Sequence, residues 1–371
     1  MITGHGGNVN ALAQRLGCPV DDIVDMSSNL NPLGPPPGLE AFLAANLNKI
    51  CSLPEVDAGD MVAAFARRHN IDPDRVMAAN GTTWFIYTLA PALVAKRMLI
   101  LGPTYSDYRD GCAVHSIAYD HAMATADNGF VPDLDLVAAL LDSNSFDTVV
   151  ICNPNNPTGV LVKKQAILDL VQGYPDVRFV VDESYLPFVD HAQDITLVGE
   201  DRFDNLLVLS SMSKIFRIPG LRTGFLCAAP GVIDRFMHFF QPWSVNALAQ
   251  AAVTHLLGAE DETEAFTALS RQFINGERSL FAKALDHCSG ITLFPSCACF
   301  VLGELEPPMD APTLCTLLGD DRILIRDCTN FQGLSSRFVR FSLKDRDTNM
   351  TLAKLLKHHL GGEMGLDRGR G

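Results

Sequence analysis

Short runs of apolar residues, each followed by a polar turn, recur through the middle of the chain. They are Thr148–Ile151, Arg178–Val181 and Leu206–Leu209. Because a strand buried on both faces needs apolar side chains throughout, these runs predict short strands of a parallel sheet. In an open parallel sheet, ligands bind beyond the carboxyl ends of the strands. We therefore expect the three turns that follow to line one crevice.

The turn after the third run carries the most informative residue, Lys214, within Ser210–Gly224. A lysine amine forms a Schiff base with an aldehyde cofactor, and Ser211, Ser213 and Arg222 are donors suited to phosphate oxygens. Pyridoxal 5'-phosphate (PLP) requires both features. Taken alone, the segment would be interpreted as an exposed Ser/Lys loop, so the other two turns decide its meaning.

Those two turns supply the remaining partners of such a cofactor. Asp182 opens Asp-Glu-Ser-Tyr, and its carboxylate can keep a pyridine nitrogen protonated. Asn156, in Cys152–Gly159, and Tyr185 can hydrogen-bond the ring hydroxyl. Each segment alone is weak, because Asn-Pro-x-x-Pro-Thr-Gly is often a plain turn. All three in this order predict a PLP site with Lys214, Asp182 and Tyr185 as catalytic residues.

With these segments the chain resembles the fold-type I PLP enzymes of the aspartate aminotransferase superfamily. The resemblance implies an α/β fold: a large domain with a mostly parallel sheet flanked by helices, and a smaller α+β C-terminal domain. It assigns the cofactor phosphate to Gly81, Thr82 and Thr83, which precede an expected helix over 84–95 whose free N–H groups attract anions. It assigns stacking on the pyridine face to Tyr105, where an aromatic could equally serve core packing.

The two ends of the chain narrow the resemblance. They resemble the L-threonine-O-3-phosphate decarboxylases of cobalamin biosynthesis over nearly the whole chain, from about His5 to Leu360. The sister histidinol-phosphate aminotransferases share the Lys, Asp, Tyr and double-arginine pattern but not the opening His-Gly-Gly-Asn. The segments that carry the closer resemblance are His5–Asn8, Asp25–Gly34, Gln241–Ala249, Arg322–Leu334 and Arg337–Arg340.

The closer resemblance implies which residues contact the substrate. A phosphoamino acid brings a phosphate and a carboxylate, and guanidinium groups bind both in bidentate fashion. We expect Arg340 to hold the carboxylate, and Arg326 with the His5 segment to hold the phosphate. A terminal tail at His5 and surface ion pairs at the arginines are the ordinary alternatives. The implied contacts are His5, Gly6, Asn29, Asn156, Arg326 and Arg340.

The implied activity is PLP-dependent decarboxylation of O-phospho-L-threonine to (R)-1-amino-2-propanol O-2-phosphate. O-phospho-L-serine is an alternative substrate, because one methyl group discriminates by only about 1–3 kcal/mol. An aminotransferase acting on histidinol phosphate or another amino acid stays open, and so does a non-catalytic protein of the same fold. The intact Lys214 and Asp182 count against the last.

The superfamily pattern also implies the domain organisation and a homodimer. We expect an N-terminal arm over 1–30 that contributes to the substrate site, a large PLP-binding domain over 31–237, and a small domain over 238–371. One departure concerns the dimer. Where dimeric relatives place a tyrosine that reaches the partner's cofactor phosphate, this chain has Leu53, which cannot donate a hydrogen bond. Losing one such bond would cost roughly 1.5–3 kcal/mol, so we expect cofactor binding to survive, with Ser52 as a possible substitute donor.

Composition limits the partners. A formal charge of −14 argues against nucleic acid, and no apolar run reaches the roughly 20 residues of a membrane span. The N-terminus lacks the features of a signal peptide, which predicts a cytoplasmic protein. The ten cysteines show no metal-ligand spacing, so we expect reduced thiols and no metal site.

Overall fold

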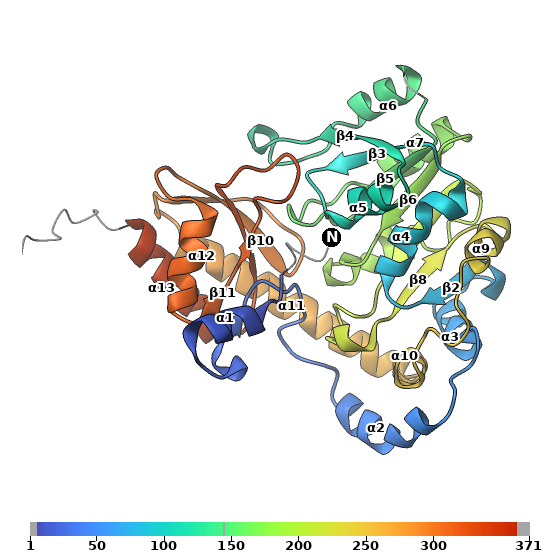
Figure 1. The fold of residues 1–371 in the computed structure, drawn as a ribbon, viewed down its shortest axis with the longest axis horizontal. Coiled ribbons are helices and arrows are strands. Elements are labelled where there is room, and N and C mark those ends of the chain that lie inside the picture. The colour runs from blue at the N-terminus through green and yellow to red at the C-terminus, as the bar shows by residue number, and fades with distance from the viewer. Residues whose placement is uncertain (1–5, 144, 362–371) are drawn as a thin grey trace, which may run out of the picture.

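The computed structural model describes residues 6–143 and 145–361, and it places two sheets side by side with one long helix running between them (Figure 1). The larger sheet has seven strands in the order β2-β8-β7-β6-β5-β3-β4. Strand β8 runs antiparallel to both of its neighbours, and the other pairs in this sheet are parallel. Its strands are β2 Val76–Ala79, β3 Arg97–Gly102, β4 Ala118–Met123, β5 Thr148–Cys152, β6 Arg178–Asp182, β7 Leu206–Ser210 and β8 Gly224–Cys227.

The smaller sheet is antiparallel, with four strands in the order β12-β13-β10-β9. A short parallel pair, β1 with β11, joins the N-terminal arm to this part of the chain. The mostly parallel sheet and the smaller antiparallel one confirm the expected fold class. These strands are β1 Val24–Asp25, β9 Ile291–Leu293, β10 Phe300–Leu305, β11 Ile323–Leu324, β12 Arg326–Asp327 and β13 Phe338–Ser342.

Helices cover both faces of the large sheet, and helix α11 runs from there to the small sheet (Figure 1). The α-helices are α1 Val9–Leu16, α2 Leu39–Ala45, α3 Gly59–His69, α4 Thr82–Leu93, α5 Asp107–Val114, α6 Leu134–Ser143, α7 Lys164–Gly173, α8 Ala192–Ile195, α9 Pro230–Met237, α10 Ala247–Gly258, α11 Glu260–Ala284, α12 Ala311–Asp320 and α13 Arg346–Gly361. Short 3-10 helices are η1 Val20–Asp22, η2 Leu47–Cys51, η3 Pro73–Arg75, η4 Ala126–Asn128, η5 Leu186–Phe188 and η6 Pro219–Leu221.

The central strands are apolar throughout because both faces of the sheet are buried. Along β5, Val149 and Ile151 belong to one hydrophobic cluster, whereas Val150 and Cys152 belong to the other. This alternation follows from the two-residue repeat of a strand. Burying such a side chain stabilises the fold by about 1.5–3 kcal/mol. The sheet is thereby a rigid platform whose strand ends carry polar residues.

The helix that follows β2 begins and ends earlier than the sequence pattern predicted. Helix α4 spans Thr82–Leu93 rather than 84–95. It begins directly after Gly81, whose φ of +85° lets the chain turn sharply, a conformation that glycine adopts without steric cost. It ends where Val94 takes a left-handed conformation and its N–H bonds back to the last turn. The first turn of α4 therefore contains both threonines of the motif.

The N-terminal arm passes between the two sheets. Met26 donates its N–H to the Leu324 carbonyl and accepts from the N–H of Ser342. Farther along, the Asn31 N–H donates to the carbonyl oxygen of Lys214 at 3.1 Å. The arm is thus anchored to the small sheet and to the lysine turn together.

Within the described residues, no helix is long and apolar enough to cross a membrane. No cluster of His, Cys, Asp and Glu in that part of the chain is arranged to hold a metal ion. All ten cysteines carry free thiols.

Candidate active site

The carboxyl ends of β5, β6 and β7 open onto one cavity of about 230 Å³. It brings together every site residue expected from the sequence except His5, which lies outside the described residues. Those lining residues are Gly6, Asn29, Gly81, Thr82, Thr83, Tyr105, Asn156, Asp182, Tyr185, Ser211, Ser213, Lys214, Arg222, Arg326 and Arg340. Segments distant in sequence therefore meet at one edge of the sheet, as strand-end geometry requires.

One end of the cavity has the composition of a phosphate site. No side chain caps the N-terminus of α4, so the N–H groups and the positive end of the helix dipole face the cavity beside Thr82 and Thr83. Arg222 lies against this turn, because a Cβ built on Gly81 would come within 2.7 Å of its Nη2. A side chain at position 81 would push the guanidinium away from this turn. These groups fit the phosphate of PLP, and Ser211 and Ser213 add hydroxyl groups at the same cavity wall.

Lys214 and Asp182 both line the cavity. Burial lowers the pKa of Lys214, and Arg222 and Arg340 lower it further. Asp182 is 4% exposed, and burial raises its pKa while hydrogen bonds from Ser184 and Tyr108 oppose that rise. The lysine amine is thereby shifted toward its neutral, nucleophilic form, which is the form that attacks an aldehyde.

Tyr185 also lines the cavity. Its hydroxyl accepts a hydrogen bond from Asn29 Nδ2 at 3.2 Å. Burial raises the pKa of Tyr185, although the charge of Arg340 opposes the rise, so the phenol keeps its proton and can donate it. The edge of its ring packs against Phe300, with ring centroids 5.1 Å apart. The position suits a donor to the ring hydroxyl of the cofactor.

Arg340, on β13, is buried, and no carboxylate among the described residues pairs with it. Its Nη1 donates to Asn156 Oδ1 and its Nη2 donates to the Ser27 carbonyl at 2.7 Å, both neutral acceptors. Its Nε is one of the buried polar atoms that have no partner among the described residues. A buried guanidinium is costly unless an anion compensates it. The group is therefore arranged to receive an anion in the cavity.

Arg326, on β12, lies next to Arg340, with Arg326 and Arg340 paired across the antiparallel ladder. Its Nη2 donates to Asn330 Oδ1 at 2.6 Å, and its guanidinium lies over the Phe331 ring. Burial and the charge of Arg340 lower the pKa of Arg326. Two buried arginines on neighbouring strands give one wall of the cavity a concentrated positive charge.

Several lining residues were not expected from the sequence. Tyr108, on the first turn of α5, donates its hydroxyl to Asp182 Oδ2 at 2.8 Å. Ser27 and Phe331 contact the two arginines, and Cys152 lies at the end of β5. No local pattern in the sequence could have identified the bond from Tyr108 to Asp182, because that contact joins α5 to β6.

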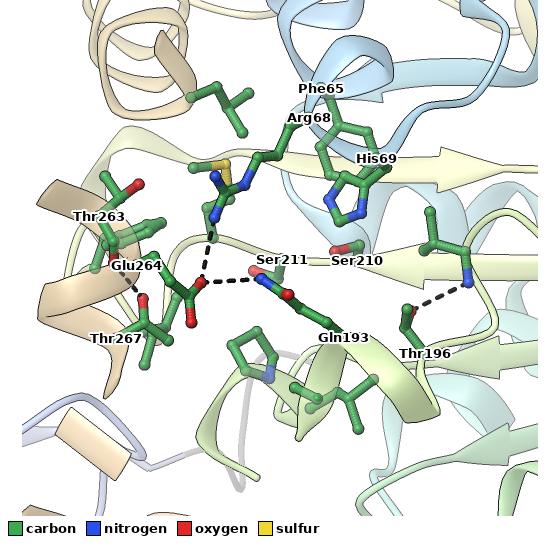
Figure 2. Close-up of a pocket in the computed structure, with 18 of the residues that line it drawn as sticks. Phe65, Arg68, His69, Gln193, Thr196, Ser210, Ser211, Thr263, Glu264 and Thr267 are labelled. Carbon is green, nitrogen blue, oxygen red and sulfur yellow. Dashed lines mark hydrogen bonds and ion pairs between the residues drawn. The ribbon is translucent and has the colours of Figure 1, made fainter. Parts of the chain in front are cut away.

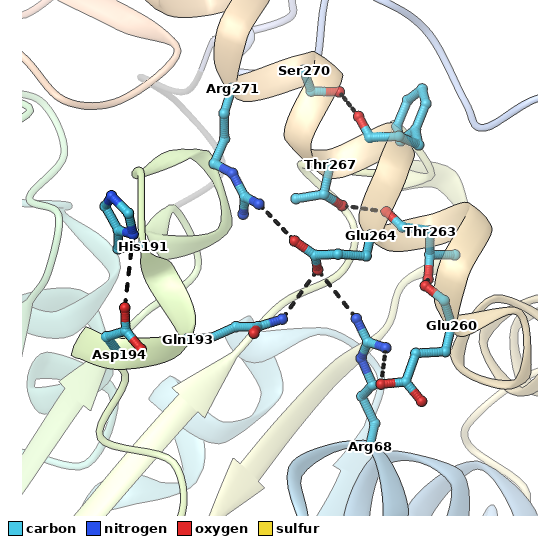
Figure 3. A network of polar contacts seen from close by, with 11 residues as sticks. Arg68, His191, Gln193, Asp194, Glu260, Thr263, Glu264, Thr267, Ser270 and Arg271 are labelled. Carbon is cyan, nitrogen blue, oxygen red and sulfur yellow. Dashed lines mark hydrogen bonds and ion pairs between the residues drawn. The ribbon is translucent and has the colours of Figure 1, made fainter.

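A second cavity, of about 360 Å³, is lined by residues of the lysine turn and of helices α3, α8 and α11 (Figure 2). The two arginines that line it, Arg68 and Arg271, pair with Glu264. Glu264 Oε2 accepts from Arg68 at 3.2 Å and from Gln193 at 3.1 Å, and Glu264 Oε1 accepts from Arg271 at 2.7 Å (Figure 3). The network fastens α11 to α3 and α8. None of the three predicted catalytic residues lines this cavity, so we place the chemistry at the other one.

The chain belongs to a family of known chemistry: a model of the family Aminotransferase class I and II matches residues 21–356. Enzymes of this family use PLP, and PLP is the cofactor of this chain, as expected from the sequence. The chain is accordingly an enzyme of the PLP-dependent aminotransferase-like superfamily.

Three proteins of known name are similar to this chain in sequence or structure. The chain is 31% identical to the threonine-phosphate decarboxylase of Salmonella typhimurium, over 97% of each chain. It is also 31% identical to the L-threonine-O-3-phosphate decarboxylase of Porphyromonas gingivalis, whose crystal structure it matches with a TM-score of 0.81, over 92% of this chain and 100% of that one. The histidinol-phosphate aminotransferase of Methanocaldococcus jannaschii is 27% identical, over 91% of this chain and 89% of the relative. The resemblance stated from the sequence is confirmed.

Proposed function

We propose that this enzyme decarboxylates O-phospho-L-threonine to (R)-1-amino-2-propanol O-2-phosphate, a building block for cobalamin. The observation that carries the proposal is the pair of buried arginines, Arg326 and Arg340, facing one cavity with Lys214. A phosphoamino acid presents two anionic groups, and two guanidinium groups can bind them separately. Similarity to two decarboxylases of this type supports the choice of reaction.

Arg340 is the group we assign to the substrate carboxylate. Its Nε is left without a partner in the described part of the chain, while the bonds to Asn156 and Ser27 fix the plane of the guanidinium. Orientation decides the reaction, because the bond that breaks at Cα must stand perpendicular to the cofactor ring. Arg340 would hold the carboxylate in that direction.

Arg326 is the group we assign to the substrate phosphate, together with Gly6 and the segment of His5. The bond from Arg326 to Asn330 and the contact with Phe331 fix the guanidinium at the cavity wall. A phosphate bound there adds binding energy remote from the reacting carbon. This division of roles predicts different losses for the two arginine variants.

PLP, bound through Lys214, supplies an electron sink for the pair left behind when the carboxylate departs. The protein supplies the rest. Asp182 would hold the proton on the ring nitrogen, Tyr105 would stack on the ring, and Tyr185 and Asn156 would bond the ring hydroxyl. Because burial lowers the pKa of the Lys214 amine, its Nζ gives up a proton more readily and would donate the proton that replaces carbon dioxide at Cα.

Substrate comparison tests the reaction. Purified PLP-loaded enzyme is mixed with O-phospho-L-threonine, O-phospho-L-serine or histidinol phosphate, and both carbon dioxide and amine products are measured. We expect release from phosphothreonine without any oxo acid. If turnover instead required 2-oxoglutarate and favoured histidinol phosphate, the enzyme would be an aminotransferase, the reaction of its 27% identical relative.

Arginine variants test the division of roles. In Arg326→Gln, we expect kcat/KM for O-phospho-L-threonine to fall about 10- to 100-fold toward the value for L-threonine, because the lost hydrogen bonds are to a charged group. In Arg340→Gln, kcat/KM should fall by the same factor for O-phospho-L-threonine and for L-threonine, because both substrates carry the carboxylate. If Arg340→Gln instead lowered only the activity on O-phospho-L-threonine, Arg340 would bind the phosphate and Arg326 the carboxylate.

We also propose that the enzyme is a homodimer, with the arm over 1–30, large domain over 31–237 and small domain over 238–371 expected from the sequence. An apolar surface supports the dimer: Ile50, Leu53 and Trp243 are 67%, 74% and 49% exposed. Trp243 is tied to this segment, because its N–H donates to the carbonyl of Val56 at 2.9 Å. Leu53 does not line its own chain's cavity.

Sedimentation of wild type and Ile50→Glu at several concentrations tests the dimer. We expect the variant to dissociate at concentrations where the wild type stays dimeric, because a charge is placed in an apolar contact. A wild type that sediments as a monomer throughout would refute the proposal.

A further inference from the structure

Tyr108 is a buried hydroxyl that the assigned chemistry does not use. It lies on the first turn of α5, three residues after Tyr105, and is 3% exposed. Its ring stands edge-on to that of Tyr105, with centroids 6.0 Å apart. Its hydroxyl donates to Asp182 Oδ2 at 2.8 Å. One side chain therefore contacts both the residue assigned to the cofactor's face and the residue assigned to its ring nitrogen.

The Asp182 carboxylate has a defined set of donors. Oδ1 accepts from the N–H of Ser184 at 2.9 Å, and Oδ2 accepts from Tyr108. An ionised carboxylate offers about four acceptor positions, so the two bonds fix its plane and leave positions for a ring N–H. Without them, a carboxyl group that is 4% exposed would be favoured in its neutral form.

Other titratable groups near Asp182 do not replace this donor. Burial raises the pKa of Cys152 to about 12, so its thiol stays neutral. Lys214 favours the ionised form of Asp182, but that amine is committed to the cofactor aldehyde once the cofactor is bound. The charge of Asp182 raises the pKa of Glu183, because like charges disfavour each other, so Glu183 does not help to ionise Asp182. Burial also keeps the Tyr108 phenol protonated, so it acts as a donor.

We propose that Tyr108 is a positioning residue that keeps the Asp182 carboxylate ionised and oriented, so that the proton shared with the cofactor stays on the ring nitrogen. The inference rests on the proposed assignment of Asp182 to that nitrogen. A hydrogen bond to a charged group makes the acceptor a weaker base. Removing the donor should move the shared proton toward the carboxyl by about a 10- to 100-fold change in the ratio of the two positions.

The first experiment locates that proton. Enzyme loaded with nitrogen-15 PLP is studied by solid-state NMR, whose ring-nitrogen shift reports protonation. Tyr108→Phe keeps the aromatic ring and removes only the hydroxyl, and we expect its shift to move toward that of neutral pyridine. Tyr174→Phe, which removes a hydroxyl bonded to Asp142 away from the cavity, should keep the wild-type shift.

An Asp182→Asn variant distinguishes the role of Tyr108 from the assignment of Asp182 to the ring nitrogen. If that variant moves the shift and Tyr108→Phe does not, the role of Tyr108 is refuted while the assignment of Asp182 stands. If neither variant moves it, Asp182 does not face the ring nitrogen and the inference falls with that assignment. Neither result depends on which substrate the enzyme decarboxylates.

A binding measurement distinguishes loss of the interaction with the ring nitrogen from general damage to the site. Affinity of the apoenzyme is compared for PLP and for an analogue in which C–H replaces the ring nitrogen. In Tyr108→Phe, we expect the preference for PLP over the analogue to fall about 10- to 100-fold relative to wild type. A variant with a merely damaged site would bind both more weakly by the same factor, and that result would overturn the proposal.

Discussion

Replacing Glu183 by glutamine should change how the stability of the protein depends on pH. Glu183 follows Asp182 at the end of β6, but it lines the second cavity and is 3% exposed. Burial raises its pKa from 4.5 to about 7, although bonds from Thr196 Oγ1 and the Leu197 N–H oppose the rise. Between these values the folded protein keeps a proton that the unfolded chain releases.

The difference between the folded-state and unfolded-state pKa of Glu183 sets the sign and the size of the change in stability with pH. Where the folded state binds more protons, the free energy of unfolding falls as pH rises. The difference between a pKa of 4.5 and one of about 7 corresponds to at most about 3.4 kcal/mol, of which about 2–3 kcal/mol falls between pH 5 and pH 8. The Glu183→Gln side chain is nearly isosteric and cannot ionise. It should therefore remove this part of the pH dependence.

Urea unfolding at pH 5, 6, 7 and 8, with PLP saturating, measures the effect. We expect the stability of Glu183→Gln relative to wild type to increase by about 2–3 kcal/mol across the series. Glu262→Gln, an exposed change on α11, is the matched control and should follow the wild type. Parallel curves for wild type and Glu183→Gln would show that Glu183 does not titrate in this window, and would refute the reasoning.

Other substitutions test the rest of the account. Gly81→Ala should weaken PLP binding about tenfold or more, as measured by equilibrium titration, because its Cβ would meet Arg222 and its φ of +85° is strained by about 1–3 kcal/mol. Arg68→Ala should lower the free energy of unfolding by about 1–2 kcal/mol through loss of its contacts to Glu264, with no change in the absorbance of the bound cofactor. Lys214→Ala should abolish the visible absorbance of the lysine-bound cofactor and lower turnover about a hundredfold or more.

The strands and the cofactor cavity could be predicted because their signals are local. The apolar runs before Cys152, Asp182 and Ser210 form β5, β6 and β7, since a strand buried on both faces allows few other residues. Each turn that follows contains its candidate cofactor-binding residues in a short motif. The order of the motifs then places them at one edge of the sheet.

Features that depend on contacts distant in sequence could not be predicted. Nothing near Tyr108 in the sequence indicates a bond to Asp182, because that contact joins α5 to β6. The exact start of α4 depends on the conformation of Gly81. Glu183 carries a raised pKa because tertiary packing buries it. These three features depend on the folded structure, so they cannot be predicted from a short stretch of sequence.

The most direct test of the central claim is the stoichiometry of carbon dioxide release. PLP-loaded enzyme is incubated with carboxyl-labelled O-phospho-L-threonine, with no oxo acid, and labelled carbon dioxide is counted per bound cofactor. We predict many equivalents per PLP, matched by equal amounts of (R)-1-amino-2-propanol O-2-phosphate. Consumption of one equivalent of substrate or less per PLP, without labelled carbon dioxide, would indicate an amino-transfer half-reaction and would contradict the account.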